Sequence, residues 1–342
     1  MSPQFVDFDA DGNLDIVAGT FDGSPHVAYG TGKGWKQPVS ILDRDGQRIL
    51  LNQFWNFDTK KWDTTTRCDL PGHTLGSGHL TSAVAMDWDG NGVLDLLLGD
   101  HSTGHVYRRM NEGTTSKPAF SDKNLPLEAD GKPIDVPGTV ATLRLVDWNA
   151  DGLVDLLCGS MGDAYGDKEG GGIYLYLNTG TKTAPRFAAP LVLVPRSQKG
   201  PVEEPTRPDS GVYMDLADYD GDGDFDLVVG GYSHWKPKVP VLTKEQNAQV
   251  KRLRTEFAIV ESKLEVLAKA VQEATKGLEG DAIKEKAQEI YKTQRTERSE
   301  LGRQSAAIHK ELDPLVPGPK RIAYVWLYEN LTAKPAARKA DR

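Results

Sequence analysis

The sequence of 342 residues is poor in cysteine and lacks long apolar runs. Its two cysteines, Cys68 and Cys158, are fewer than a disulfide framework normally uses, so a bond between them is an alternative to two free thiols. We expect Cys158 to pack in a strand as a small hydrophobe. No apolar stretch approaches the roughly 20 residues that a helix needs to cross a bilayer. The sequence therefore predicts no membrane span.

An excess of basic residues and the common catalytic motifs are lacking too. Lys and Arg number 41 against 49 Asp and Glu, which gives a formal net charge of −8. Because no basic stripe is present, we expect no nucleic-acid partner. The sequence contains no GxSxG nucleophile elbow, no HExxH zinc motif and no Walker loop. We therefore assign no catalytic residue, and a role other than catalysis is favoured.

What is present is one nine-residue motif, written four times. It reads DFDADGNLD at 7–15, DWDGNGVLD at 87–95, DWNADGLVD at 147–155 and DYDGDGDFD at 218–226. Oxygen-bearing side chains stand at positions 1, 3, 5 and 9 around a glycine at position 6, which is how a short loop surrounds a hard cation such as Ca²⁺. We predict about four Ca²⁺ ions, one per loop, whose charge would offset the acidity of the chain.

The predicted metal-binding residues are positions 1, 3, 5, 7 and 9 of each loop. They are Asp7, Asp9, Asp11, Asn13, Asp15; Asp87, Asp89, Asn91, Val93, Asp95; Asp147, Asn149, Asp151, Leu153, Asp155; and Asp218, Asp220, Asp222, Asp224, Asp226. An EF-hand is excluded, because that motif needs a Glu at position 12, and this chain has Ala18, Leu98, Cys158 and Val229 there.

Each loop lies between two apolar stretches. The stretch after the loop is short, is rich in Val, Leu and Ile, and closes at Gly19, Gly99, Gly159 or Gly230, which is typical of a buried strand. A further strand follows at about residues 26, 105, 172 and 322. The predicted repeat is therefore strand A, loop, strand B, turn, strand C and an outer strand D. The aromatic residues at loop position 2, Phe8, Trp88, Trp148 and Tyr219, are expected to pack between repeats, with a ligand-stacking role as the alternative.

With these loops and strands the chain resembles the FG-GAP or VCBS repeat family, over residues 3–235 and 320–332. The calcium-loaded repeats of that family build the β-propeller of integrin α-subunits and of many secreted bacterial proteins. The resemblance implies a mostly β fold, a propeller of about four or five blades, and calcium, but no particular reaction. Asn91 and Asn149 replace aspartates of the motif, so we expect weaker binding in the second and third loops. The extra stretch at 51–63 is either a decorated connector or a degenerate blade.

The segment from Thr243 to about Leu312 has a different pattern. Apolar residues three and four apart predict an a/d seam, at Val250, Leu253, Phe257, Val260, Leu264, Leu267, Val271 and Ala274. Thr243 and Gln246 predict a capping box, and Asp281 is expected to cap a second helix. We predict an antiparallel α-helical coiled-coil hairpin at 238–318, with one continuous helix as the alternative.

This arm is inserted between strands B and C of the last blade. The predicted organisation is therefore propeller blades at 1–237, the arm at 238–318, a final propeller strand at 319–332 and a flexible tail at 333–342. The arm is either a solvated hairpin or an element that docks a partner or self-associates.

The turns opposite the calcium loops carry most of the histidines. We predict a ligand face there, made of His26, His73, His79, His101, His105, His234 and Trp235, for a protein or glycan ligand. Imidazoles that gather could bind a metal, titrate near neutral pH or bind a glycan by hydrogen bonds. The alternative is that these histidines are scattered turn residues.

The function that fits these features is a calcium-stabilised binding or scaffold module. We expect it to be extracytoplasmic, because moderate-affinity loops fill only at extracellular calcium concentrations. No signal peptide stands at the start, so any targeting segment is expected upstream of this sequence. A polysaccharide-active enzyme of the lyase type and a purely structural part of a larger secreted protein are the alternatives.

Overall fold

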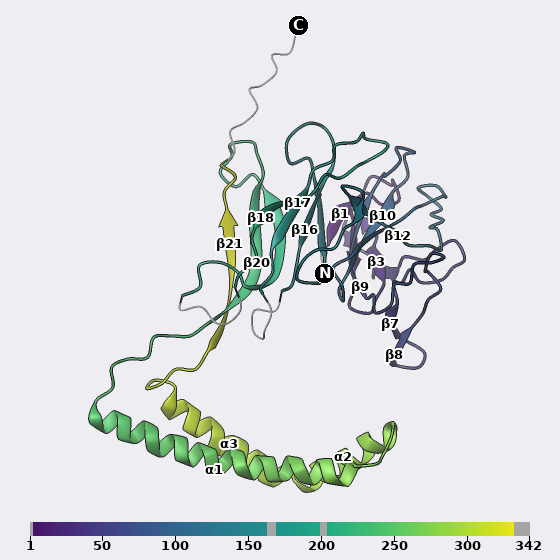
Figure 1. The fold of residues 1–342 in the computed structure, drawn as a ribbon. Coiled ribbons are helices and arrows are strands. Elements are labelled where there is room, and N and C mark those ends of the chain that lie inside the picture. Colours follow the sequence, from purple (N-terminus) through teal and green to yellow (C-terminus); the bar gives the residue numbers. More distant parts are fainter. Residues whose placement is uncertain (1–2, 163–168, 199–203, 332–342) are drawn as a thin grey trace. The chain divides into compact units, whose positions relative to one another are not determined.

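The computed structural model describes residues 3–162, 169–198 and 204–331 (Figure 1). The chain divides into two compact units, one of Met1–His234 with Arg321–Arg342 and one of Trp235–Lys320. The first unit is mostly β, and the second contains three helices. The predicted tail at 333–342 lies outside the described residues. Among the residues that are described, no helix is long and apolar enough to cross a membrane.

Among the described residues of the first unit, four antiparallel sheets of three or four strands form its main part. The first has the order β1(Gln4–Val6), β2(Asp15–Gly19), β3(Pro25–Ala28), β6(Val39–Ser40), and the second β9(Leu80–Met86), β10(Asp95–Asp100), β11(Val106–Arg109), β12(Leu125–Pro126). The third has β15(Thr142–Val146), β16(Asp155–Gly159), β17(Ile173–Tyr176), β18(Leu191–Val194), and the fourth β19(Ser210–Ala217), β20(Asp226–Trp235), β21(Lys320–Tyr328). In every sheet an acidic loop joins the first two strands, as the predicted repeat requires.

The fourth sheet differs from its prediction in length. Strand β20 continues past Gly230 to Trp235, and β21 begins at Lys320, before Ile322. His234 and Trp235 therefore lie in a strand and not in a turn, which corrects their predicted placement. The sequence signal at Gly230 was misleading, because the pairing of the two strands carries on beyond that glycine.

Short hairpins complete the first unit. They are β4(Gly30–Thr31) with β5(Gly34–Trp35), β7(Gln53–Asn56) with β8(Lys61–Thr64), and β13(Glu128–Ala129) with β14(Lys132–Pro133). The extra stretch predicted at 51–63 forms the β7–β8 hairpin. It is a two-stranded ribbon and not a four-stranded sheet.

Consecutive sheets pack on each other through alternating side chains. In β10, Leu96 and Leu98 join a hydrophobic cluster with the first sheet, whereas Leu97 joins a cluster with the third. Successive side chains of a strand point to opposite faces, so one strand serves two interfaces. Strands β10 and β16 are buried at every position, whereas β2 in the first sheet alternates between buried and half-buried residues. The inner sheets are covered on both faces.

The two cysteines are buried and are not bonded to each other. Cys158 lies in the cluster between the second and third sheets, where it packs as the small hydrophobe that was expected. The disulfide alternative is wrong.

Glycines at the ends of three strands allow the sheets to approach closely. A Cβ built on Gly19 would lie 2.5 Å from the backbone nitrogen of Ser82, and one on Gly159 would lie 2.5 Å from the carbonyl oxygen of Val212. Gly99 has the same relation to the carbonyl of Ala141. In each case the neighbour belongs to the next sheet, so any side chain would push two sheets apart.

The second unit contains α1(Lys244–Thr275), α2(Asp281–Thr293) and α3(Arg295–Leu312). Helix α1 begins with the predicted capping box, in which the Gln246 backbone N–H donates to Thr243 Oγ1 and the Thr243 N–H donates to Gln246 Oε1. The prediction for Asp281 is wrong, because the cap is Gly280 and Asp281 is the first helical residue. The predicted second helix is also interrupted at Gln294, whose side chain donates to the carbonyl oxygen of Leu267.

Helices α1 and α3 share a narrow apolar core. Leu253 and Val260 of α1 and Leu301 and Ile308 of α3 form its buried cluster. Arg252, near the start of α1, lies 4.0 Å from Glu311, near the end of α3, so the two helices run in opposite directions. Helix α2 has no buried residue.

We predict that the first unit folds without the arm. Strands β20 and β21 are neighbours in one sheet, so a short glycine-containing turn in place of residues 238–318 can join them. We expect the shortened protein to keep a β-type circular dichroism spectrum and a cooperative thermal transition. An unfolded product would contradict this and would make the helices part of the core.

Candidate metal centres

All four loops repeat one network of hydrogen bonds. The carboxylate at position 1 accepts from the backbone N–H at position 6, as in Asp7 from Gly12 at 3.0 Å and Asp147 from Gly152 at 2.8 Å. The side-chain oxygens at positions 3 and 5 accept from N–H groups two residues on, in every loop. These bonds hold the side-chain oxygens in a tight turn around the glycine at position 6.

The carboxylate at position 9 accepts hydrogen bonds from the backbone on both sides of its strand. Asp95 is fully buried, and its two oxygens accept from the N–H of Trp88 in the loop, at 3.0 Å, and from the N–H of Asn111 beyond strand C, at 2.6 Å. The same pair of bonds recurs at the buried residues Asp15, Asp155 and Asp226. Position 9 therefore ties each loop to the end of the third strand of its sheet.

The oxygen atoms come close enough to share a cation in three of the loops. One oxygen from each member lies within 4.8 Å of the others in Asp7, Asp9 and Asp15, in Asp87, Asp89 and Asp95, and in Asp218, Asp220 and Asp222. In the third loop Asn149 stands at position 3, so one of the donors is an amide. A donor set made only of oxygens suits Ca²⁺ and does not suit a soft metal.

Charge crowding and burial act on these carboxyls in the absence of metal. Burial raises the pKa of Asp95 and of Asp155, although the two backbone N–H donors of each oppose that shift. Burial and then the charges of Asp11 and Asp15 raise the pKa of Asp9. Asp226 is the exception, because the N–H groups of Asn330 and Tyr219 lower its pKa.

The asparagines after strand C were not predicted as part of the site. Asn111 and Asn178 donate their backbone N–H to the position 9 carboxylate, and Asn330 does the same in the fourth sheet. The side-chain oxygen of Asn111 also accepts from Gly113 and Ala119, which closes the following turn. The signal was in the sequence, because an asparagine ends three of the four third strands.

The predicted histidine face does not form one cluster. His79 and His101 have ring centroids 5.4 Å apart, whereas His73 and His105 each lie 6.3 Å from the ring of Tyr107. His26 lies in β3 with its Nε2 3.5 Å from a carboxylate oxygen of Asp22. The remaining residues of the predicted face, His234 and Trp235, lie in β20, where His234 has its ring 6.4 Å from that of Tyr232.

An aromatic surface, which we define as Phe21, Trp55, Trp62, His79 and His101, gathers beside the His79–His101 pair. Phe21 and Trp62 are exposed, their ring centroids are 5.6 Å apart, and each lies close to His79. The Nε2–H of His79 donates to the carbonyl oxygen of Phe21 at 3.0 Å. Burial and then the neighbouring His79 lower the pKa of His101, so that imidazole is neutral near pH 7. Sequence reasoning missed Phe21, Trp55 and Trp62.

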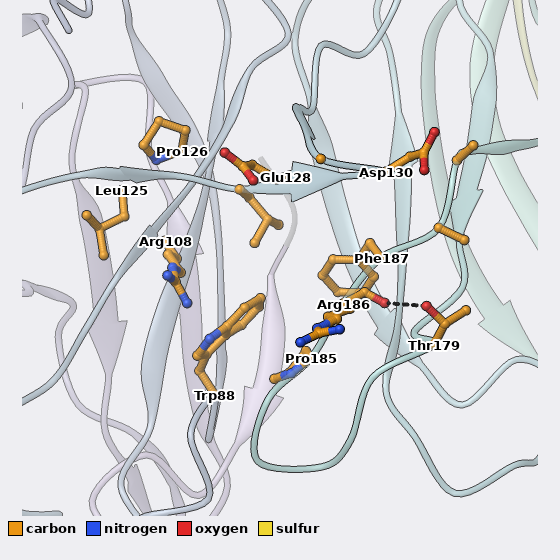
Figure 2. Close-up of a pocket in the computed structure, with 14 residues that line it drawn as sticks. Trp88, Arg108, Leu125, Pro126, Glu128, Asp130, Thr179, Pro185, Arg186 and Phe187 are labelled. Atoms are coloured by element: carbon orange, nitrogen blue, oxygen red, sulfur yellow. Dashed lines mark hydrogen bonds between the residues drawn. The ribbon is translucent and has the colours of Figure 1, made fainter. Parts of the chain in front are cut away.

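A cleft of about 700 Å³ opens between the second and third sheets (Figure 2). Trp88, Arg108, Glu128, Asp130, Arg186 and Phe187 are among its lining residues. The guanidinium carbon of Arg108 lies 4.9 Å from the ring centroid of Trp88, and burial lowers the pKa of Arg108. Because Trp88 belongs to the second loop, the cleft lies at the loop end of the sheets and not at the predicted histidine face.

Three sheets of four strands and one of three, each with an acidic loop between its first two strands, define a β-rich repeat protein. The outer strand predicted for every repeat is found in the first three sheets and not among the described residues of the fourth. A family model described as an FG-GAP-like repeat matches residues 147–229, from the start of the third loop to Val229 in β20. The chain thus carries an FG-GAP-like repeat, and the predicted resemblance to that family is confirmed. No curated protein and no solved structure matches the chain significantly.

We predict that positions 9 and 3 of a loop respond differently to substitution. Asp95→Ala leaves two N–H groups without their charged acceptor, so it should lower the free energy of unfolding by about 3 kcal/mol even in chelator. Asp89→Ala loses one loop bond of 3.2 Å and should cost under about 1 kcal/mol in chelator, with a larger loss when calcium is added. Urea unfolding in the two conditions measures both. Equal losses in chelator would contradict the anchoring role of position 9.

Proposed function

We propose that the first unit is a calcium-stabilised β-propeller module. The observation that carries this proposal is the network that all four loops repeat around clustered side-chain oxygens. Four stacked antiparallel sheets with a loop at the same place in each also favour propeller blades. A cation bound only by the folded loops would relieve the repulsion among their carboxylates and stabilise the fold.

An extracytoplasmic site of action follows from the same chemistry. Position 5 is exposed in every loop and position 3 in all but the first, where Asp9 is half-buried. One or two waters or backbone carbonyls, including those of the position 7 residues, would complete the ligand set. Sites of this kind have moderate affinity and fill at the calcium concentrations found outside cells. The FG-GAP-like match supports this assignment, since such repeats are typical of extracellular proteins.

The module is proposed to bind a macromolecular ligand, and the aromatic surface supports a protein ligand. Trp, Phe and Arg are enriched in interfaces, and Arg48 lies beside this surface, where its guanidinium donates to the carbonyl oxygen of Trp55 at 2.7 Å. The cleft supports a glycan as the second candidate, because its Trp88 platform lies beside the charged groups of Glu128, Asp130 and Arg186.

The helical arm is a candidate docking or self-association element. Its α1–α3 seam is already filled, but α2 leaves Ile283 and Tyr291 exposed. A lyase-type enzyme is a weaker alternative, because the neutral His101 supplies a possible base without an assigned charge-neutralising partner. A structural role in a larger protein is the third alternative.

We predict that calcium stabilises the protein strongly. At a free concentration 100 times the dissociation constant, each site adds about 2.7 kcal/mol, which corresponds to several degrees in melting temperature for a unit of this size. Excess chelator should therefore lower the melting temperature, and calorimetric titration should give about four sites, with the first and fourth loops tighter than the second and third. Asp7→Asn should remove or weaken one site only. An unchanged melting curve in chelator would refute the proposal.

We also predict that Trp62 contributes to ligand binding. Peptides selected from a display library on the calcium-loaded protein should bind Trp62→Ala at least about tenfold more weakly, because a truncated aromatic anchor typically costs more than 1 kcal/mol. Tyr324→Ala, an aromatic residue of β21 that is as exposed as Trp62, is the matched control and should bind normally. If a glycan array instead detects binding that Arg186→Ser abolishes, the ligand site is the cleft.

A further inference from the structure

One aromatic contact recurs where consecutive sheets meet. Phe8, at position 2 of the first loop, stacks on Phe120 of the second sheet's outer turn with ring centroids 6.3 Å apart. Trp88, at the same position of the second loop, packs on Phe187 of the third sheet's outer turn at 6.1 Å. All four rings are at least nine-tenths buried. The loop of one sheet therefore supplies a ring, and the turn of the next sheet receives it.

Trp35 is the receiving ring of the first sheet. It pairs with Gly30 as Phe120 pairs with Asn111 and Phe187 with Asn178. Gly30 in turn donates its N–H to Asp15, as those two asparagines donate to Asp95 and Asp155. Yet Trp35 is 52% exposed, although its Nε1–H is fixed by a 2.8 Å bond to the carbonyl of Leu14. The receiving position of the first sheet is in place and uncovered.

Tyr219 is the supplying ring of the fourth sheet, and it is 68% exposed. Tyr219 was expected to pack between repeats. Phe8 and Trp88 are buried and Trp148 is half-buried, whereas Tyr219 is exposed. No ring partner of Tyr219 is found among the described residues. The two halves of the recurring contact are thus both exposed, one at each end of the row of sheets.

The first and fourth sheets also each have a face that no other described sheet covers. Gly19, Gly99 and Gly159 each press against the next sheet, but a Cβ on Gly230 would meet only the carbonyl of Tyr213 in its own sheet, at 3.8 Å. Val325 and Leu327 of β21 are also exposed. On the first sheet, Phe5 of β1 is exposed and lies 5.9 Å from Trp35, centroid to centroid. An apolar face is open at each end.

We propose that two copies of this chain associate head to tail, with the fourth sheet of one packed on the first sheet of the other and Tyr219 on the partner's receiving ring. The partner's first sheet offers Gly230 and Tyr219 the contacts that they lack in their own chain. The glycine contact is already made at three internal boundaries, and the ring contact at two. Mutual exchange of this contact closes a ring, whereas exchange that does not close gives longer open assemblies.

The test uses the full chain in calcium and two blocked variants, Tyr219→Ser and Trp35→Ser. Light scattering coupled to size exclusion should give a concentration-dependent dimer for the wild type and a monomer for each variant, with a dissociation constant raised at least about 30-fold. Mixing the two variants should give a 1:1 dimer that is weaker than the wild-type dimer. Tyr219 of the Trp35→Ser chain can pack on Trp35 of the Tyr219→Ser chain, so one of the two contacts is intact. No other surface predicts this complementation.

Controls separate this contact from folding and from the arm. Phe57→Ser removes another exposed aromatic ring and should associate like the wild type. Both blocked variants should keep their calcium stoichiometry and melting temperature, which excludes misfolding as the cause of dissociation. Three outcomes would each overturn the proposal: a wild type that is monomeric at about 100 μM, variants that dimerise normally, or a mixture that stays monomeric. Variants that dimerise normally would indicate that the arm is the contact.

Discussion

The buried carboxylate at position 9 is the interaction on which each repeat depends. In Asp15, Asp95, Asp155 and Asp226 it joins the loop to the end of the third strand through two backbone N–H donors. A carboxylate can be buried only when hydrogen-bond donors satisfy its charge, so the burial of position 9 depends on these two bonds. Burial nevertheless raises the pKa of Asp95 and Asp155. A raised carboxyl pKa means that ionisation above that pKa opposes folding, and a bound cation would remove this cost.

The stacking of the sheets follows from two further constraints. Glycines at the far ends of β2, β10 and β16 let each sheet approach the backbone of the next, and at the loop end the position 2 rings Phe8 and Trp88 pack on a ring of the next sheet. Both devices sit on the strand pair that the position 9 carboxylate holds in place. One nine-residue motif therefore sets the loop, the sheet and the boundary with the neighbouring sheet.

Most of the β repeat could be predicted from the sequence, because alternation and glycine punctuation are local signals. The capping box at Thr243 was equally local and is confirmed. The predicted strand end at Gly230 was wrong because a tertiary contact decides it, since β21 offers β20 a partner beyond that glycine. The predicted start of α2 was wrong by one residue, because Gly280 and not Asp281 is the cap. The aromatic surface was missed because Phe21 and Trp62 lie far apart in the sequence and meet only in the fold.

The exposure of Tyr219 could not be predicted from the motif either. Its loop is the same as the others, and only the position of the fourth sheet at the end of the row leaves the ring uncovered. A sequence repeat predicts what a residue is suited to contact, but the number and order of repeats decide whether the contact is made.

The arm separates β20 from β21 in the sequence, so pairing these strands costs loop-closure entropy. The folded structure of the arm reduces this cost. The bond from Asn330 to Asp226 spans 104 residues, whereas the equivalent bond from Asn111 to Asp95 spans 16. For a flexible loop this difference would cost about 2 kcal/mol. The α1–α3 core and the approach of Arg252, in the third turn of α1, to Glu311, in the last turn of α3, hold these two helices together. A folded arm therefore has fewer conformations than a flexible loop of the same length, which lowers the entropic cost of pairing β20 with β21.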